Sequence, residues 1–164
     1  MAGKTVSFCD IKTTPSKRTP VKTRLLRHKG GFSWQGVSTE KYKPEDATWA
    51  YVIRRVLVGG GGERTKFHLR YFELAPGGYT SFERHRHEHV VIGVRGMGKC
   101  RAGEKVYNIK FMDTLYICPD EPHQLENPYA GPFGFFCIVD AKRDRPKGVR
   151  NPRPKGSATP KIKA

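Results

Sequence analysis

Short strand-like runs dominate the middle of this chain and limit the folds that it can adopt. Between about residues 50 and 140, runs rich in Val, Ile, Phe and Tyr alternate with Gly- and Pro-containing turn signals, and no stretch keeps a period of about 3.6 residues. Many short strands at such spacing predict an all-β sandwich or small barrel, because closing the sheet removes its exposed edges. The preceding segment, 31–49, is expected to lie against this unit as an irregular or edge strand. The strand-like runs are TWAYVIRRVLVG, TKFHLRYFEL, HVVIGVRG, KCRAGEKVYNIKF, TLYIC, HQLEN and FGFFCIVD.

One of these runs follows a cluster of histidines. In Glu83-Arg-His85-Arg-His87-Glu-His89, alternate side chains of an extended strand point the same way, so one carboxylate and three imidazoles share a face. A fourth histidine, His123, follows in Pro-His-Gln-Leu-Glu-Asn a few strands later. Together these side chains indicate a site for a divalent transition metal, whereas the alternative is an exposed histidine-rich stretch. The apolar, strand-like sequence around both stretches favours the metal site.

Two stretches resemble the two signature motifs of the cupin superfamily. GGYTSFERHRHEHVVIGVRGMG resembles the first motif, and MDTLYICPDEPHQLEN resembles the second. The stretch RYFELAPGG is similar to the strand that precedes the first motif in many small cupins. The resemblance covers about residues 50–140. It implies a cupin double-stranded β-helix, that is, a jelly-roll barrel, whose interior holds a metal on three or four side chains from these motifs.

The resemblance also implies a set of ligands. In the first motif the last ligand lies seven residues before the turn glycine, Gly96, which gives His89, and Glu83 then stands where a histidine is usual. The ligand of the second motif matches His123. A local shift of register would make His87 a ligand instead. The ranked metal ligands are His85, His89 and His123, then Glu83, then His87.

The match to the second motif is incomplete, and the ligand types leave the metal open. Met112, Cys118 and Glu121 replace a glycine, a proline and a second glycine of that motif, although Asp113 fits it. Imidazoles with one carboxylate suit Zn, Fe, Mn, Ni or Cu, and no cysteine occupies a ligand position of either motif. A metal with open positions could act as a Lewis acid or activate dioxygen, whereas a closed tetrahedral zinc would be structural.

Other groups for substrate chemistry are single residues on the expected strands. The sequence identifies no general acid or base, and the catalytic residues stay unknown. The only candidates are strand residues that could face inward, namely Tyr107, Tyr116, Glu73 and Cys137, for each of which packing or a rim position is the alternative. Arg54, Arg55 and Arg70 offer an anchor for a carboxylate or a phosphate, unless they lie on the outer face of their strands.

Net charge divides the chain into three parts. Residues 1–30 carry +7, residues 31–140 carry +1 and residues 141–164 carry +8 of the formal total of +16. The sequence therefore predicts a cupin domain at 31–140 between two basic tails, which bury too little apolar surface to fold alone. Such tails resemble those of ribosomal proteins and bind RNA by neutralising phosphates, whereas solubilising tails without a partner are the alternative. The predicted RNA-binding residues are Lys4, Lys12, Lys17, Arg18, Lys22, Arg24, Arg27, Lys29, Lys142, Arg143, Arg145, Lys147, Arg150, Arg153, Lys155, Lys161 and Lys163.

Length and composition add several expectations. A chain of 164 residues fits one domain with its own core. The sequence contains no run of about 18 apolar residues, so no membrane span is expected, and the N-terminus has no apolar signal region. We therefore expect a cytoplasmic protein whose four cysteines, Cys9, Cys100, Cys118 and Cys137, are reduced thiols.

Two functions compete at this stage. The charge distribution favours a metal-binding cupin that its tails anchor to RNA, as a ribosome-associated or ribonucleoprotein component. The histidine cluster supports the alternative, a metal-dependent cupin enzyme of oxygenase, isomerase or decarboxylase type with a small-molecule ligand in the barrel. The resemblance is compatible with a homodimer, because cupins often pair through barrel strands. Fold alone does not separate the two functions, since one fold hosts many chemistries.

Overall fold

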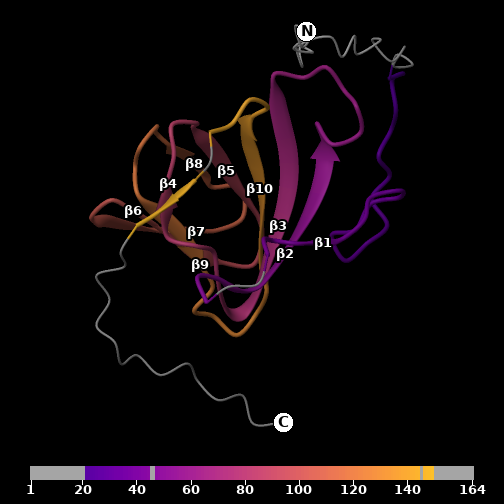
Figure 1. Cartoon of the computed structure of the whole chain (residues 1–164). Coiled ribbons are helices and arrows are strands. Elements are labelled where there is room, and N and C mark those ends of the chain that lie inside the picture. The colour runs from indigo at the N-terminus through magenta and orange to yellow at the C-terminus, as the bar shows by residue number, and fades with distance from the viewer. Residues whose placement is uncertain (1–20, 45–46, 145, 150–164) are drawn as a thin grey trace, which may run out of the picture.

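The computed structural model describes residues 21–44, 47–144 and 146–149, and this part of the chain consists of strands and loops (Figure 1). No helix occurs in these residues, and hence none that is long and apolar enough to cross a membrane. This confirms the predicted all-β class. The eleven strands are β1 (Glu40–Lys41), β2 (Ala50–Val58), β3 (Phe67–Tyr79), β4 (Glu83–Arg84), β5 (His89–Arg95), β6 (Gly98–Ala102), β7 (Lys105–Ile109), β8 (Thr114–Ile117), β9 (His123–Glu126), β10 (Phe133–Asp140) and β11 (Lys147–Gly148).

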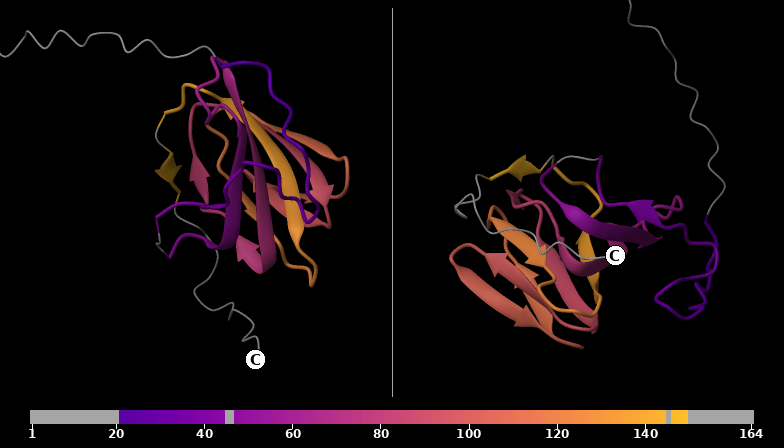
Figure 2. Two further views of the ribbon diagram at one scale, coloured as in Figure 1. Left: turned by 90° about the vertical axis from the view of Figure 1, so that its right-hand side faces the viewer. Right: turned by 90° about the horizontal axis from the view of Figure 1, so that it is seen from below.

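The strands form two antiparallel layers that face each other (Figures 1 and 2). One layer has the order β1-β2-β3-β10-β5-β8, and the other has the order β7-β6-β9-β4-β11. Tyr79, at the end of β3, pairs with Glu126 of β9 and joins the layers. A hairpin turn at Gly103 connects β6 to β7. The arrangement is a jelly-roll barrel.

The apolar core lies between the two layers. Alternation of side chains along each strand sends one set inward, as in β5, where Val91 is fully buried and its neighbours are less so. Phe72 of β3 and Phe135 of β10 stack across the interior with their ring centroids 5.5 Å apart. The thiols of Cys100 and Cys137 belong to this interior and are free.

A second packed face lies outside the barrel, where the segment around residues 27–36 crosses the outer layer (Figure 2, left). Tyr71 of β3 belongs to this face, yet it is 0% exposed. Phe32 stacks on its ring at a centroid distance of 5.3 Å, and Trp34 contacts it at 5.3 Å. The described residues of the segment 31–49 thus lie against the barrel as expected, and β1 pairs with the edge of β2.

A close approach at the start of β6 gives a test of this packing. A Cβ atom at Gly98 would lie 2.0 Å from Cδ1 of Phe133, which is 0% exposed in the core. We expect Gly98→Ala to lower the free energy of unfolding by about 1–3 kcal/mol, since overpacking forces strain on a dense core. Urea denaturation measures this difference. Gly131→Ala, where a Cβ meets no atom within 4 Å, is the matched control; equal stabilities of the two variants would contradict the packing.

Candidate metal centre

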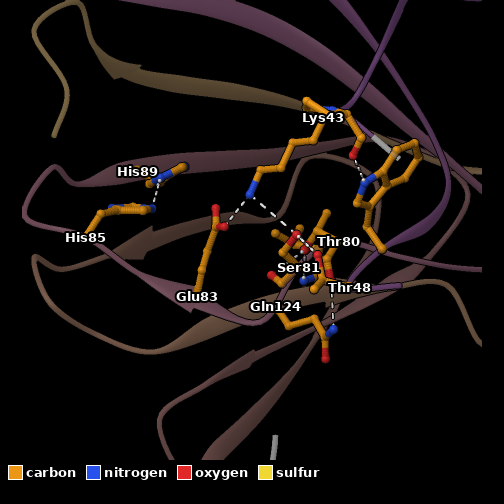
Figure 3. A network of polar contacts seen from close by, with 11 residues as sticks. Lys43, Thr48, Thr80, Ser81, Glu83, His85, His89 and Gln124 are labelled. Carbon is orange, nitrogen blue, oxygen red and sulfur yellow. Dashed lines mark hydrogen bonds and ion pairs between the residues drawn. The ribbon is translucent and has the colours of Figure 1, made fainter. Parts of the chain in front are cut away.

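The barrel brings the four predicted histidines together. His85 follows β4, His89 begins β5 and His123 begins β9. The loop between β4 and β5 and the loop before β9 therefore set their positions. The Nε2 atoms of His85 and His89 lie 3.0 Å apart (Figure 3). The ring of His123 lies 4.9 Å from that of His85 and 5.1 Å from that of His89, between centroids. His87 stacks on His85 with its centroid at 3.6 Å.

Backbone carbonyl groups orient two of these rings. Nδ1 of His85 donates a hydrogen bond to the carbonyl oxygen of His87, and Nδ1 of His123 donates one to that of Glu121, each over 2.8 Å. A carbonyl oxygen can only accept, so the proton lies on Nδ1 in both rings. The lone pair is therefore on Nε2, the atom that each ring presents to the cluster. This is the usual arrangement of a metal-binding histidine.

Side chains hold the other two rings by the same atom. Nδ1 of His87 lies 2.8 Å from Oδ1 of Asp144, and Nδ1 of His89 lies 3.2 Å from Sγ of Cys137. The Asp144 carboxylate also accepts hydrogen bonds from the backbone N–H groups of Arg86 and His87, at 3.0 and 3.3 Å. These bonds, that from Arg86 first, hold the pKa of Asp144 below its usual range. The rings of His85, His87 and His123 thus keep the lone pair on Nε2, because their Nδ1 atoms donate to oxygens that only accept. A thiol can donate or accept, so the proton of His89 can lie on either of its ring nitrogens.

Burial keeps the cluster in the form that binds metal. Desolvation, followed by the charges of neighbouring rings, lowers the pKa of His89 well below its usual value. Desolvation is also the main cause that lowers the pKa of His85 and of His123. Neutral imidazole is the ligand form, so metal does not have to displace protons from these rings at neutral pH.

The donor set fits a divalent transition metal, with one position in question. His85, His87 and His89 offer ligand atoms that all lie within 4.8 Å of one another. The Glu83 carboxylate faces the same space from β4, but it forms an ion pair with Nζ of Lys43 (Figure 3). Imidazoles with a carboxylate suit Zn, Fe, Mn, Ni and Cu alike. The choice of the fourth ligand between Glu83 and His87 stays a prediction, as does the identity of the metal.

The histidines open into a pocket of about 210 Å³ inside the barrel. Of the three arginines expected to form an anchor, Arg54 and Arg70 line this pocket, whereas Arg55 lies over the ring of Tyr71. Sequence reasoning missed much of the wall, because these side chains come from outside the histidine motifs or carry no metal-binding signature. The missed residues that line the pocket are Tyr42, Lys43, Thr80, Ser81, Arg143, Asp144 and Pro146.

Only one of the four candidate acids and bases lies in the pocket. Cys137 lines it, between His89 and Arg70. Tyr107 and Tyr116 are 39% and 56% exposed on strands β7 and β8, so they belong to the surface. Glu73 is held by hydrogen bonds from Tyr71 and Arg95 and does not line the pocket.

Part of the predicted C-terminal tail forms one wall of this site. Residues 147–148 form β11, which pairs with Glu83 and Arg84 of β4 (Figure 1). Just before β11, Arg143, Asp144 and Pro146 line the pocket. Described residues beyond position 140 are therefore part of the site, although the sequence predicts the barrel domain to end there.

Some of the predicted RNA-binding residues lie in the described part of the chain, and the others lie outside it. Arg24 forms an ion pair with Glu63, and Arg143 lines the pocket, so both contact the barrel. The other described members are Lys22, Arg27, Lys29, Lys142 and Lys147. Lys4, Lys12, Lys17, Arg18, Arg145, Arg150, Arg153, Lys155, Lys161 and Lys163, like Cys9, lie outside the described residues.

A jelly-roll barrel with an interior histidine cluster defines a small β-barrel protein of metal-binding type. The chain belongs to the cupin superfamily, as its two motifs predict: residues 70–139 match the family model described as "Cupin domain". It is 38% identical over 117 residues to 1-methylthio-D-xylulose 5-phosphate methylsulfurylase of Rhodospirillum rubrum, covering 71% of this chain and 74% of that protein.

Solved structures agree with this assignment. A cupin-2 domain protein from Rhodospirillum rubrum is 34% identical and superposes with a TM-score of 0.67, covering 80% of this chain and 83% of that one. A cupin 2 conserved barrel domain protein from Rhodopseudomonas palustris is also 34% identical, with a TM-score of 0.72 and coverage of 77% and 87%. The predicted cupin jelly roll is confirmed.

Proposed function

We propose that the protein is a metal-dependent cupin enzyme that acts on a small phosphorylated sugar derivative. Its relative from Rhodospirillum rubrum is named for 1-methylthio-D-xylulose 5-phosphate, a ketose with a phosphate at one end and a methylthio group at the other. The similarity supports the enzyme alternative of the two predicted functions. The specific reaction that we assign is transfer of the methylthio group from C1 of the ketose to a small thiol: the C1–S bond breaks, an S–S bond forms to give a methyl disulfide, and the proton of the thiol ends on C1 as a C–H bond.

The observation that carries the proposal is that one pocket contains both the histidine cluster and a group of cations. His85, His89 and His123 line it together with Arg54 and Arg70. A ligand in this pocket therefore meets neutral imidazoles and guanidinium groups at once. A sugar phosphate has a matching composition, since its carbonyl and hydroxyl oxygens suit a metal and its phosphate suits arginine.

The residues that would hold the metal are His85, His89 and His123 through Nε2, with Glu83 or His87 in the fourth position. When bound, such an ion supplies a Lewis acid that polarises a carbonyl oxygen. The ion pair of Lys43 with Glu83, and a 3.4 Å contact from Lys43 Nζ to Ser81 Oγ, fix the carboxylate beside the cluster (Figure 3).

Other lining residues set the environment of the ligand. Burial, and next the Glu83 carboxylate, raise the pKa of Tyr42, so its hydroxyl keeps its proton and can donate a hydrogen bond into the pocket. Phe72, Val91 and Phe135 provide apolar lining. Apolar walls exclude water from a ligand and strengthen its polar contacts.

The test is turnover by the full-length chain loaded separately with Mn²⁺, Fe²⁺, Zn²⁺, Ni²⁺ or Cu²⁺. 1-Methylthio-D-xylulose 5-phosphate is supplied with a small thiol, and its consumption is followed by phosphorus NMR and mass spectrometry. We expect loss of the methylthio group with at least one metal and none after treatment with a chelator. Absence of turnover with every metal, while the protein holds one equivalent, would contradict the assigned reaction.

RNA binding by the basic tails stays a prediction, and so does a cytoplasmic location. The basis for predicting RNA binding is the positive charge of residues 1–30 and 141–164. Because Arg143 and Asp144 belong to the pocket, a truncation that separates the two functions must keep residues up to 149.

A further inference from the structure

Three guanidinium groups meet on one side of the pocket. In the pairing of β2 with β3, Arg54 lies opposite Phe72, and Arg70 is two residues from Phe72 on the same strand. Residues two apart on a strand share a face, so Arg54 and Arg70 both point inward with Phe72. Arg143, from the segment before β11, lines the same pocket. Residues distant in sequence thus bring like charges together.

Two of these cations lack a counter-ion. Arg54 forms an ion pair with Glu40 at 2.7 Å. Within residues 21–44, 47–144 and 146–149, neither Arg70 nor Arg143 forms an ion pair. Arg143 donates only to the backbone oxygen of Asp140, at 2.9 Å. Asp140 lies near Arg143 and Asp144 lines the pocket, but among the described residues neither carboxylate forms an ion pair with Arg70 or Arg143, and Asp144 pairs with His87 instead. This side of the pocket therefore keeps a positive potential.

Arg70 also has an unused donor. Its Nη2 lies 3.2 Å from Sγ of Cys137, and its guanidinium lies 5.1 Å from the ring centroid of Phe72. Its Nε is buried and has no hydrogen-bond partner. A buried donor without a partner destabilises the protein, so among the described residues the Arg70 guanidinium is held in the pocket wall with part of its hydrogen-bonding capacity unused.

The like charges of Arg70 and Arg54 act on Arg143. Burial, followed by the charges of Arg70 and Arg54, lowers this pKa from its ordinary value. Lys43 adds little to this positive potential, because its charge is neutralised by the Glu83 carboxylate on the histidine side of the pocket.

The cationic side lies one side chain away from the histidine cluster. Sγ of Cys137 lies 3.2 Å from Nη2 of Arg70 and also 3.2 Å from Nδ1 of His89. A single small molecule in a pocket of about 210 Å³ can therefore place an anionic group at Arg70 and an oxygen at the histidines. Arginine suits the anionic end, since its planar fork binds phosphate oxygens in pairs.

We propose that Arg70 and Arg143, with Arg54 beside them, form the binding site for the phosphate group of the substrate. That the phosphate belongs to a sugar derivative rests on the proposed function, whereas the anion site itself rests on the three arginines. Arg70 would contact the phosphate from the barrel interior and Arg143 from the rim.

The first experiment uses inorganic phosphate as the probe and the full-length chain in the presence of EDTA, which prevents phosphate from binding through a metal. Isothermal titration is expected to show that Arg70→Gln and Arg143→Gln each weaken phosphate binding about 10-fold or more, since each removes charge-assisted hydrogen bonds. Arg84→Gln, which removes an exposed charge on β4 that does not line the pocket, is the control and is expected to bind like the wild type.

A second measurement separates this site from the proposed reaction. With the metal-loaded protein, Arg143→Gln is expected to raise KM for 1-methylthio-D-xylulose 5-phosphate while kcat changes little; a residue that only supports the fold would not give this split. Because Arg143 lies at the rim, this variant remains informative if Arg70→Gln fails to fold. Phosphate binding that depends on both arginines without turnover would retain the site and reject the reaction. Turnover with unchanged KM in both variants, or no phosphate binding by the wild type at millimolar concentration, would overturn the site.

Discussion

Replacing His89 with alanine is expected to reduce the metal content of the purified protein to background. His89 belongs to every ligand set that the cluster allows, and its Nε2 lies 3.0 Å from that of His85. Loss of a group that merely orients a ligand weakens metal binding about 10–100-fold, so loss of a ligand is expected to exceed about 100-fold. Competition with a chromophoric chelator measures the affinity, and elemental analysis measures the content.

The matched control is His68→Ala. His68 lies on β3 outside the pocket, so its removal tests whether loss of any partly buried histidine has the same effect. We expect this variant to retain the wild-type metal content. Circular dichroism of both variants separates loss of a ligand from loss of the fold. One equivalent of metal in folded His89→Ala would show that the histidine cluster is not the metal site.

The fold and the cluster could be predicted because their signals are local. A strand has a period of two residues, so the spacing of Glu83, His85, His87 and His89 indicates a shared direction without any knowledge of long-range contacts. The turn at Gly103 and the runs on either side of it are equally local. The position of His123 relative to this cluster required a resemblance to known motifs, because the two stretches meet only through the barrel.

The part of the pocket wall that residues 141–149 form could not be predicted, because their composition indicates a tail whereas the fold places them against the barrel. Residues 141–149 resemble a tail in composition, being rich in Lys, Arg and Pro. Their place is set by contacts that no local pattern shows, such as the pairing of β11 with β4 and the bond from the N–H of Ala141 to the oxygen of Lys66. Asp144 is the only acidic residue between 141 and 164, and this single carboxylate in a basic stretch was the one sequence signal that these residues contact the barrel.

Arg54, Arg55 and Arg70 show a related limit. Strand alternation places the side chains of Arg54 and Arg55 on opposite faces of the sheet, but it does not indicate which of the two faces inward. The answer depends on the register with β3, where Arg54 lies opposite Phe72 of the core. It also depends on the segment around Trp34, which covers the outer face of β3 by packing on Tyr71. Arg55 lies on this outer face, over the ring of Tyr71.

Substituting Asp144 with alanine is expected to weaken metal binding about 10–100-fold if His87 is a ligand. The carboxylate holds Nδ1 of His87 at 2.8 Å and accepts the backbone N–H groups of Arg86 and His87, so it fixes both the ring and the turn that carries it. Without it, the His87 ring loses the partner that directs Nε2 into the cluster. The dissociation constant from chelator competition gives the size of the effect.

Two further variants interpret the result. Lys142→Ala changes an exposed residue of the same segment that does not line the pocket, and it is expected to leave the affinity unchanged. His87→Gln is expected to weaken binding at least as much as Asp144→Ala, because it removes the ligand itself, and the double variant should then bind metal no more weakly than His87→Gln alone. If instead Asp144→Ala binds like the wild type and Glu83→Gln weakens binding, Glu83 takes the fourth position. The Lys43–Glu83 ion pair would then compete with the metal for the carboxylate, because Nζ of Lys43 occupies one of its oxygens.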